Sequence, residues 1–204
     1  MGEKLSKDYS IAAEYQKLQG MPFIGDHDFD VDLEKECFMS VNVIRANPKA
    51  FKTHFEHVMG LKDGYDGKKG NKFLKWLEKL PQDTSFAPLS VDRDVMAACR
   101  ENNENLKSVT KDKDIPTDGN TKVLARIMNS TKSTDIVEFT YWSTWKHTAH
   151  ELVLLNILVD FERHDTSIIL CERAMRCGFA YAGHPKFGNM FQAVFVMQKS
   201  NNML

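Results

Sequence analysis

The sequence contains little cysteine, and the few cysteines are scattered. Four of the 204 residues are cysteine, and none forms a C-x-x-C pair. The first 20 residues contain no apolar run of secretory length, so we expect no signal peptide and a reducing environment. The thiols are therefore predicted to be reduced and mostly buried. They are Cys37, Cys99, Cys171 and Cys177.

An excess of charge of one sign is also missing. Lys and Arg number 27 and Asp and Glu number 28, which gives a formal net charge of −1. This balance argues against a dedicated nucleic-acid binder, which usually carries a basic patch. It also argues against a polybasic protein of the membrane surface. With 42% hydrophobic and 27% charged residues, the composition is that of an ordinary globular domain.

No long hydrophobic run is present. The best apolar stretch, residues 152–159, contains Asn156 and is too short to cross a membrane. Without a leader or a span, the expected location is cytoplasmic, or at least intracellular. Gly2 followed by Ser6 matches part of a myristoylation signal, so acylation of Gly2 is an alternative route to a membrane.

Residues 1–35 are predicted to form an N-terminal extension, and residues 36–204 a single domain. Within residues 1–32, seven acidic residues outnumber three lysines, and several apolar residues are interspersed without sustained periodicity. We expect this extension to be a docking arm that contacts other proteins of a large assembly. Its acidic residues would suit a basic partner surface.

Apolar periodicity predicts helices before strands along the domain. A helix capped by Asp32 should end at Asn47-Pro48, and further helices should cover residues 50–59, 73–80 and 149–160. Another should begin after Ser90 or Asp92, with residues 102–104 facing away from its apolar stripe. Three antiparallel strands are expected at residues 168–170, 177–182 and 190–198, whereas residues 134–145 are ambiguous.

Two patterns in the sequence resemble metal sites, but neither is the favoured interpretation. Asp26-x-Asp28-x-Asp30 begins like a calcium loop, but the sixth and twelfth positions hold Val31 and Cys37 instead of Gly and Glu. The acidic run is better explained as a solvated stretch or a protein contact.

The second pattern is a group of histidines. If residues 147–151 are helical, His147 and His150 lie on one side, next to Glu151, and His54 and His57 repeat the same spacing. These residues match no known zinc-protease motif, so surface or partly buried histidines are the favoured interpretation and zinc is the alternative.

Other candidate chemistry is weaker. Cys99 lies on an apolar helix stripe, which suggests an inert thiol. The GKKG phrase at 67–70 is too short for a phosphate loop and is predicted to be a surface loop. Trp76 is expected in the core, whereas Trp142 and Trp145 are expected either in the core or in a contact surface.

Several phrases resemble CAP/SCP-like domains, the superfamily of cysteine-rich secretory proteins, antigen 5 and pathogenesis-related 1. VNVIRANP at 41–48 is similar to the opening helix of that family, and PLSVD at 88–92 to a later helix start. RH with IIL at 163–170 and the GFAYAGH and FGNM phrases at 178–190 are similar to its later segments. The resemblance covers roughly residues 36–198 and implies a divergent intracellular member.

The resemblance implies an α+β fold, an α-β-α sandwich with a central antiparallel sheet flanked by helices. It also implies a cavity with two His and two acidic residues. His164 matches the later His, and Glu151 plausibly matches one acid, but the other two positions have no counterpart. The expectation is therefore a remnant cavity at Glu151 and His164 with no catalytic residues, no metal and no cofactor.

Three functions follow from this interpretation. The favoured one is a non-enzymatic intracellular module that acts as a structural or interaction component of a larger assembly, with a cytoskeletal or ciliary scaffold as one candidate. The second is a lipid- or sterol-binding, membrane-associated module. The third is a residual hydrolase that uses His164 and Glu151.

Overall fold

The computed structural model describes most of the chain. Its described residues are 9–25, 27–60, 67–110, 125, 128–129, 136–143 and 147–198. For residues 67–69 and 138–143 only the backbone is described. Gly2, Asp26, Trp145 and the side chain of Trp142 lie outside this description. No helix within it is long and apolar enough to cross a membrane.

Six helices and four strands carry the described fold. The helices are α1 (Ile11–Lys17), α2 (Asp32–Ala46), α3 (Lys52–Met59), α4 (Gly67–Lys79), α5 (Arg93–Leu106) and α7 (Ala149–His164), with a 3-10 turn η1 (Pro48–Phe51) before α3. The strands are β1 (Ser90–Val91), β2 (Ile136–Ser143), β3 (Ala174–His184) and β4 (Gly188–Met197). The α+β class is confirmed.

The sheet has the strand order β1-β3-β4-β2. β3 pairs antiparallel with β4 across a tight turn, and β4 pairs antiparallel with β2. β1 instead runs parallel to β3, so the sheet is mixed and not purely antiparallel as expected. The turn depends on Gly188, which has a φ of +83°, a conformation that favours glycine.

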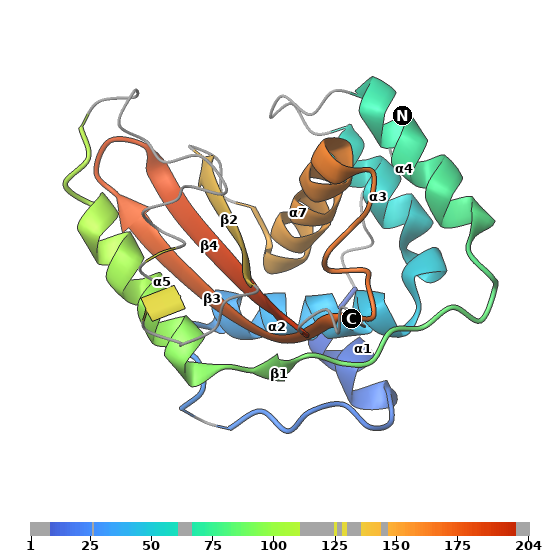
Figure 1. Cartoon of the computed structure of the whole chain (residues 1–204), viewed down its shortest axis with the longest axis horizontal. Helices are drawn as coiled ribbons and strands as arrows, with labels where there is room; N and C mark the ends of the chain where they lie inside the picture. Colours follow the sequence, from blue (N-terminus) through green and yellow to red (C-terminus); the bar gives the residue numbers. More distant parts are fainter. Residues whose placement is uncertain are drawn as a thin grey trace, which may run out of the picture.

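Helices cover both faces of this sheet, as an α-β-α sandwich requires. Phe179 and Phe195 lie in one core with Phe38 of α2, whereas Ala180 and Val194 lie in a second core with residues of α5. Because neighbouring strand residues point to opposite faces, α2 and α5 pack on opposite sides of the sheet. Figure 1 shows α5 on one side of β3 and β4, with α2 on the other and α3, α4 and α7 beyond it.

Helix α5 approaches β3 very closely at Gly178. A Cβ atom at this position would lie 2.6 Å from Val95 Cγ1 and 2.8 Å from the backbone nitrogen of Met96. Real Cβ atoms essentially never come this close, so glycine is needed for the helix to pack on the strand.

The N-terminal extension packs on the domain itself. α1 lies against α2, and its Ile11 and Tyr15 are buried in the main core. A boundary at residue 35 also falls inside α2. The docking of this arm on a partner stays a prediction, but its first helix already has a binding surface within the same chain.

The acidic residues of the extension find basic partners in α5. Arg93 donates to Asp28 at 2.7 Å, and Arg100 forms ion pairs with Asp30 at 2.8 Å and with the buried Glu34 at 3.0 Å. The bonds from Arg93 and from the backbone of Gly25 hold the pKa of Asp28 below its usual value. The expected basic surface is thus supplied in part by the chain's own α5.

Four local expectations were wrong. The GKKG phrase at 67–70, expected as a surface loop, forms the first turn of α4. Residues 168–170 form a bend and turn instead of a strand, and Asn102 and Asn103 are buried instead of facing away. Asp32 is the first residue of α2 and not its cap, which is Val31 without a side-chain bond. The alternative Asp92 does cap α5, since its carboxylate accepts from the backbone of Asp94 and Val95.

Arg45 explains why residues 168–170 do not form a strand. This residue is fully buried, and its guanidinium donates to the backbone carbonyls of Ala87, Ile169, Cys171 and Ala174. The loop is therefore folded around a side chain of α2 and not paired with a neighbouring strand. Burial lowers the pKa of Arg45 to about 10, so the group remains charged at neutral pH.

Asn42, one turn earlier in α2, fixes the other side of this region. Its amide accepts from the backbone nitrogen of Leu89 at 2.7 Å and donates to the Leu89 carbonyl at 3.2 Å. The Asn and Arg of the VNVIRANP phrase thus brace two separate loops from one helix.

Candidate functional site

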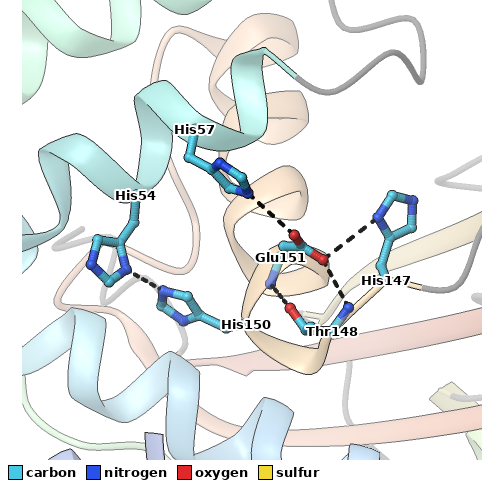
Figure 2. Close-up of polar contacts among 6 residues, drawn as sticks. All are labelled: His54, His57, His147, Thr148, His150 and Glu151. Carbon is cyan, nitrogen blue, oxygen red and sulfur yellow. Dashed lines mark hydrogen bonds and ion pairs between the residues drawn. The ribbon is translucent and has the colours of Figure 1, made fainter. Parts of the chain in front are cut away.

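Four histidines and one glutamate meet between α3 and the start of α7. We call this group the histidine cluster; it consists of His54, His57, His147, His150 and Glu151. Figure 2 shows that it has two parts, an inner pair, His54 and His150, and an outer trio in which His57 and His147 approach Glu151 from opposite sides. The two parts have different burial and different partners.

The two helices place these side chains in different ways. His54 and His57 are three residues apart in α3, so both point toward α7, as the spacing predicted. His147 does not share a face with His150, because α7 begins at Ala149 and His147 lies before it. The condition on which the expected His147–His150 pair depended is therefore not met.

Glu151 fixes the start of α7. The Thr148 hydroxyl accepts from the Glu151 backbone at 3.2 Å, and the Glu151 carboxylate accepts from the Thr148 backbone at 2.9 Å. This reciprocal capping box satisfies backbone donors that the first helical turn would otherwise leave unpaired. It also fixes the carboxylate between two imidazoles.

The inner pair is deeply placed. His150 is 5% exposed, and its two ring nitrogens lie 2.6 Å from Ser40 Oγ and 2.8 Å from His54 Nδ1. Burial, followed by the nearby His54 and His57, lowers the pKa of His150 to about 3. The pKa of His54 is also lowered, by burial and then by His57. Both rings are therefore neutral at physiological pH.

Aromatic rings enclose the inner pair. Tyr9 lies 4.8 Å from the His54 ring and 5.2 Å from the His150 ring, measured between centroids, and Phe51 contacts the same two rings. The Tyr9 hydroxyl is buried without a hydrogen-bond partner, and burial raises its pKa. These contacts exclude water from the imidazoles, which is the physical cause of their low pKa values.

The outer trio has two partly accessible side chains and one that is nearly buried, since the His147 side chain is only 6% exposed. His57 Nε2 lies 3.4 Å from one carboxylate oxygen of Glu151, and His147 Nδ1 lies 4.0 Å from the other. The Glu151 and His57 side chains are 16% and 19% exposed. A proton on either histidine would therefore be stabilised by an adjacent negative charge.

The arrangement does not favour a metal site. In the part of the chain that the structure describes, no group of three or more His, Cys, Asp or Glu side chains is placed to hold a metal ion. The inner nitrogens hydrogen-bond to each other, and the outer histidines lie on opposite sides of a carboxylate, so neither part converges on one point. Zinc needs about four ligands in a tetrahedral arrangement.

The arrangement also does not favour nucleophilic catalysis. Ser40, His150 and His54 form a hydrogen-bonded chain of the kind that activates a nucleophile. Ser40 is fully buried in the middle of α2, however, and His150 is nearly so. A substrate could reach the hydroxyl only if the helices separated, so the chain is best explained as structural.

The two residues of the expected remnant cavity are not brought together. Glu151 is in the first turn of α7 and His164 is its last residue. At 1.5 Å per residue, the 13-residue separation places them about 20 Å apart. His164 is 57% exposed and contacts the buried Asp160, whose pKa is raised by burial. A hydrolase that uses both residues at one site is therefore not supported by their positions.

The histidine spacing indicates pairs within one helix but not contacts between helices. The contacts join one histidine of α3 to one residue of α7, about 95 positions away. The chemistry of Ser40 and Tyr9 was not anticipated, because neither carries a motif.

Comparison with known proteins does not assign the chain to a family. No protein-family model matches the chain, and no curated protein matches it significantly. The resemblance to CAP/SCP-like domains therefore stays a prediction that rests on the quoted phrases. Since one fold can host many functions, function must be argued from particular surfaces and sites.

Proposed function

We propose that the chain is a non-enzymatic intracellular interaction module of a larger protein assembly, and that it binds a partner through residues 18–31. A cytoskeletal or ciliary scaffold is one candidate for that assembly. The proposal is carried mainly by one observation: the side chain of Phe23 is 91% exposed on a segment whose neighbouring residues are fixed.

Anchors on both sides hold the backbone around Phe23. The Tyr15 hydroxyl donates to the Pro22 carbonyl at 2.7 Å, and the Gly25 nitrogen donates to Asp28 at 2.7 Å. Ile24 packs against the main core. The phenyl ring is thus presented to solvent from a segment with little freedom left to lose on binding, which favours affinity.

Exposed apolar side chains concentrate on this segment. The described residues include three exposed large hydrophobic side chains, and two of them, Phe23 and Val31, lie within residues 18–31. The third, Met175, is in β3. Aromatic side chains that fill a pocket on the partner are frequent hot spots of protein interfaces. We therefore expect the partner to offer an apolar pocket.

The compartment is part of the same proposal. Cys37, Cys171 and Cys177 carry free thiols, and Cys37 and Cys177 are buried. Free thiols suit a reducing compartment, where disulfides are rare.

The test compares two alanine substitutions of exposed apolar side chains in the full-length chain. Tagged wild type, Phe23→Ala and Met175→Ala are purified from source cells, and recovered proteins are quantified by mass spectrometry. A stoichiometric partner retained by wild type and Met175→Ala but reduced at least tenfold by Phe23→Ala supports the proposal. Point variants are preferable to deletion of residues 1–32, because deletion would also remove Ile11 and Tyr15 from the core.

Two results would contradict the proposal. One is equal recovery of every partner by all three proteins, which would exclude Phe23 as an anchor. The other is a monomer that carries a stoichiometric lipid or an acylated Gly2, which would favour the lipid- or sterol-binding alternative. Circular dichroism of each variant confirms that the fold is intact.

A further inference from the structure

We propose that the histidine cluster is a proton-sensitive clasp, which holds α3 and Tyr9 against α7 at neutral pH and releases them at mildly acidic pH. The inner pair opens when it takes up protons, and the outer trio then keeps the end of α3 attached. The inference is independent of the proposed partner and concerns a device within the fold.

Counting protons in the inner pair shows why it can open. The bond between His54 Nδ1 and His150 Nε2 needs one protonated and one unprotonated nitrogen. When His54 Nδ1 is the donor, a single extra proton on the outer nitrogen of His54 leaves the bond intact. A second proton, on His150, makes both facing nitrogens donors, so the bond is lost and two positive rings face each other.

Among the described residues, the direct contacts of the inner pair include no opposite charge. α2 contributes the neutral Ser40, the N-terminal segment contributes Tyr9 and η1 contributes Phe51. From α3 the nearby titratable group is His57, which raises the cost of a further positive charge. Glu14 acts on Tyr9, and Glu151 is engaged by His57, His147 and the Thr148 backbone.

The outer trio responds in the opposite direction. Protonated His57 or His147 would form an ion pair with Glu151, which is already positioned by the capping box. Acid therefore weakens the inner contact, whereas the outer contact pairs imidazoles with a carboxylate and gains no like-charge repulsion. The result is a local opening near Tyr9 and His54, with the C-terminal end of α3 still held at Glu151.

The direction of the pH effect follows from linkage. The closed state keeps His150 neutral down to a pKa of about 3, whereas a released histidine titrates near 6.5. The open state thus binds more protons between these values, so the closed state is fully stable above about pH 7 and loses stability as the pH falls. Between pH 8 and pH 5 one such histidine changes the closing equilibrium about thirtyfold.

Hydrogen exchange with mass spectrometry tests the clasp in the full-length protein. Exchange is measured at pH 7.5 and 5.0 and corrected for the intrinsic pH dependence of amide exchange. We expect the protection factors of peptides from residues 9–17 and 48–59 to be at least tenfold lower at pH 5.0 than at pH 7.5. Peptides from β3 and β4 should lose less than twofold.

A matched pair of variants assigns the effect to the inner pair. Glutamine does not titrate but can bond to both Ser40 and His54, so His150→Gln should abolish the pH-dependent loss. His164→Gln makes the same change at the exposed end of the same helix and should retain it. A loss that persists in His150→Gln, or that vanishes in His164→Gln, overturns the proposal.

Titration of wild type by NMR covers the case in which His150→Gln does not fold. Protonation of the His150 ring should coincide with loss of its contacts to His54 and Tyr9. A His150 ring that is protonated near pH 6.5 in the folded protein, without local opening, overturns the proposal.

Discussion

Two buried polar regions of this molecule, the Arg45 site and the histidine cluster, join distant segments by different kinds of partner. Arg45 carries a buried charge whose partners are backbone carbonyls from residues 87 to 174. The inner pair of the cluster consists of neutral rings whose main partners are other side chains. Both connect α2 or its neighbours to loops and helices far along the chain.

The partners decide how each region responds to pH. Backbone carbonyls do not titrate, and the pKa of Arg45, about 10, keeps that group charged throughout the physiological range. The imidazoles change state below neutral pH, and each proton alters the pattern of donors and acceptors. A buried polar group is therefore a permanent brace or a responsive contact according to what it bonds to. Five predictions test this comparison, beginning with the largest expected effect.

Replacement of the buried guanidinium should be the most damaging change. Arg45→Met keeps the bulk of the side chain but leaves the carbonyls of Ala87, Ile169, Cys171 and Ala174 without their donor. We expect a loss of about 4 kcal/mol in the free energy of unfolding, measured by urea denaturation. Arg93→Met is the control, because Arg93 is 79% exposed and should cost less than about 1 kcal/mol. Equal losses in both would refute the brace.

Asn42→Leu tests the second brace of α2. The change preserves approximate volume but removes both bonds to the backbone of Leu89, which is fully buried. Two unpaired backbone groups should cost about 3 kcal/mol in the same assay. A loss below about 1 kcal/mol would indicate that water or relaxation replaces the side chain.

The pH dependence of stability separates the two regions most sharply. Wild type should lose about 2 kcal/mol between pH 7.5 and 5.0, because unfolded histidines bind protons that folded His150 does not. The stability of Arg45→Met should be lower at every pH but fall in parallel with wild type, whereas the stability of His150→Gln should depend clearly less on pH than that of wild type. Urea denaturation at five pH values gives the three curves. A flattened curve for Arg45→Met would contradict the comparison.

Asp160 is an intermediate case, a titrating group with one backbone partner. Its carboxylate accepts from the backbone of Ile168 and from His164, and burial raises its pKa. The folded state thus holds this proton more tightly, so Asp160 stabilises the fold progressively as the pH falls toward its unfolded value of about 4. Asp160→Asn should change the free energy of unfolding by under about 1 kcal/mol at pH 7.5. At pH 4.5 the variant should be less stable relative to wild type than it is at pH 7.5.

Phe23→Ala should have the smallest effect on stability. The ring is almost wholly exposed, so its removal should shift the free energy of unfolding by less than about 0.5 kcal/mol, whatever it does to partner binding. Thermal denaturation is a sufficient check. A larger loss would mean that Phe23 belongs to the core and would remove the main support for the interaction surface.

Much of the architecture could be predicted because it depends on local sequence patterns. The stop at Asn47-Pro48, the cap at Asp92, the apolar run of α7 and the glycine at the β3–β4 turn all act within a few residues. Residues 168–170 resemble a strand in sequence, since Ile169 and Leu170 are as apolar and buried as a strand requires. The Ile169 carbonyl instead accepts from Arg45, more than 120 residues earlier, and the Leu170 nitrogen donates to Ser167.

The sequence by itself determined most of the helices, the closing β3–β4 hairpin and which residues are available for chemistry. It could not determine which of those residues meet. Periodicity and capping are set by neighbours along the chain, whereas the contacts of His54 with His150 and of Glu34 with Arg100 form only after α2, α3, α5 and α7 have packed. Packing also excluded water from His150, and that burial turned an ordinary imidazole into one that stays neutral in acid.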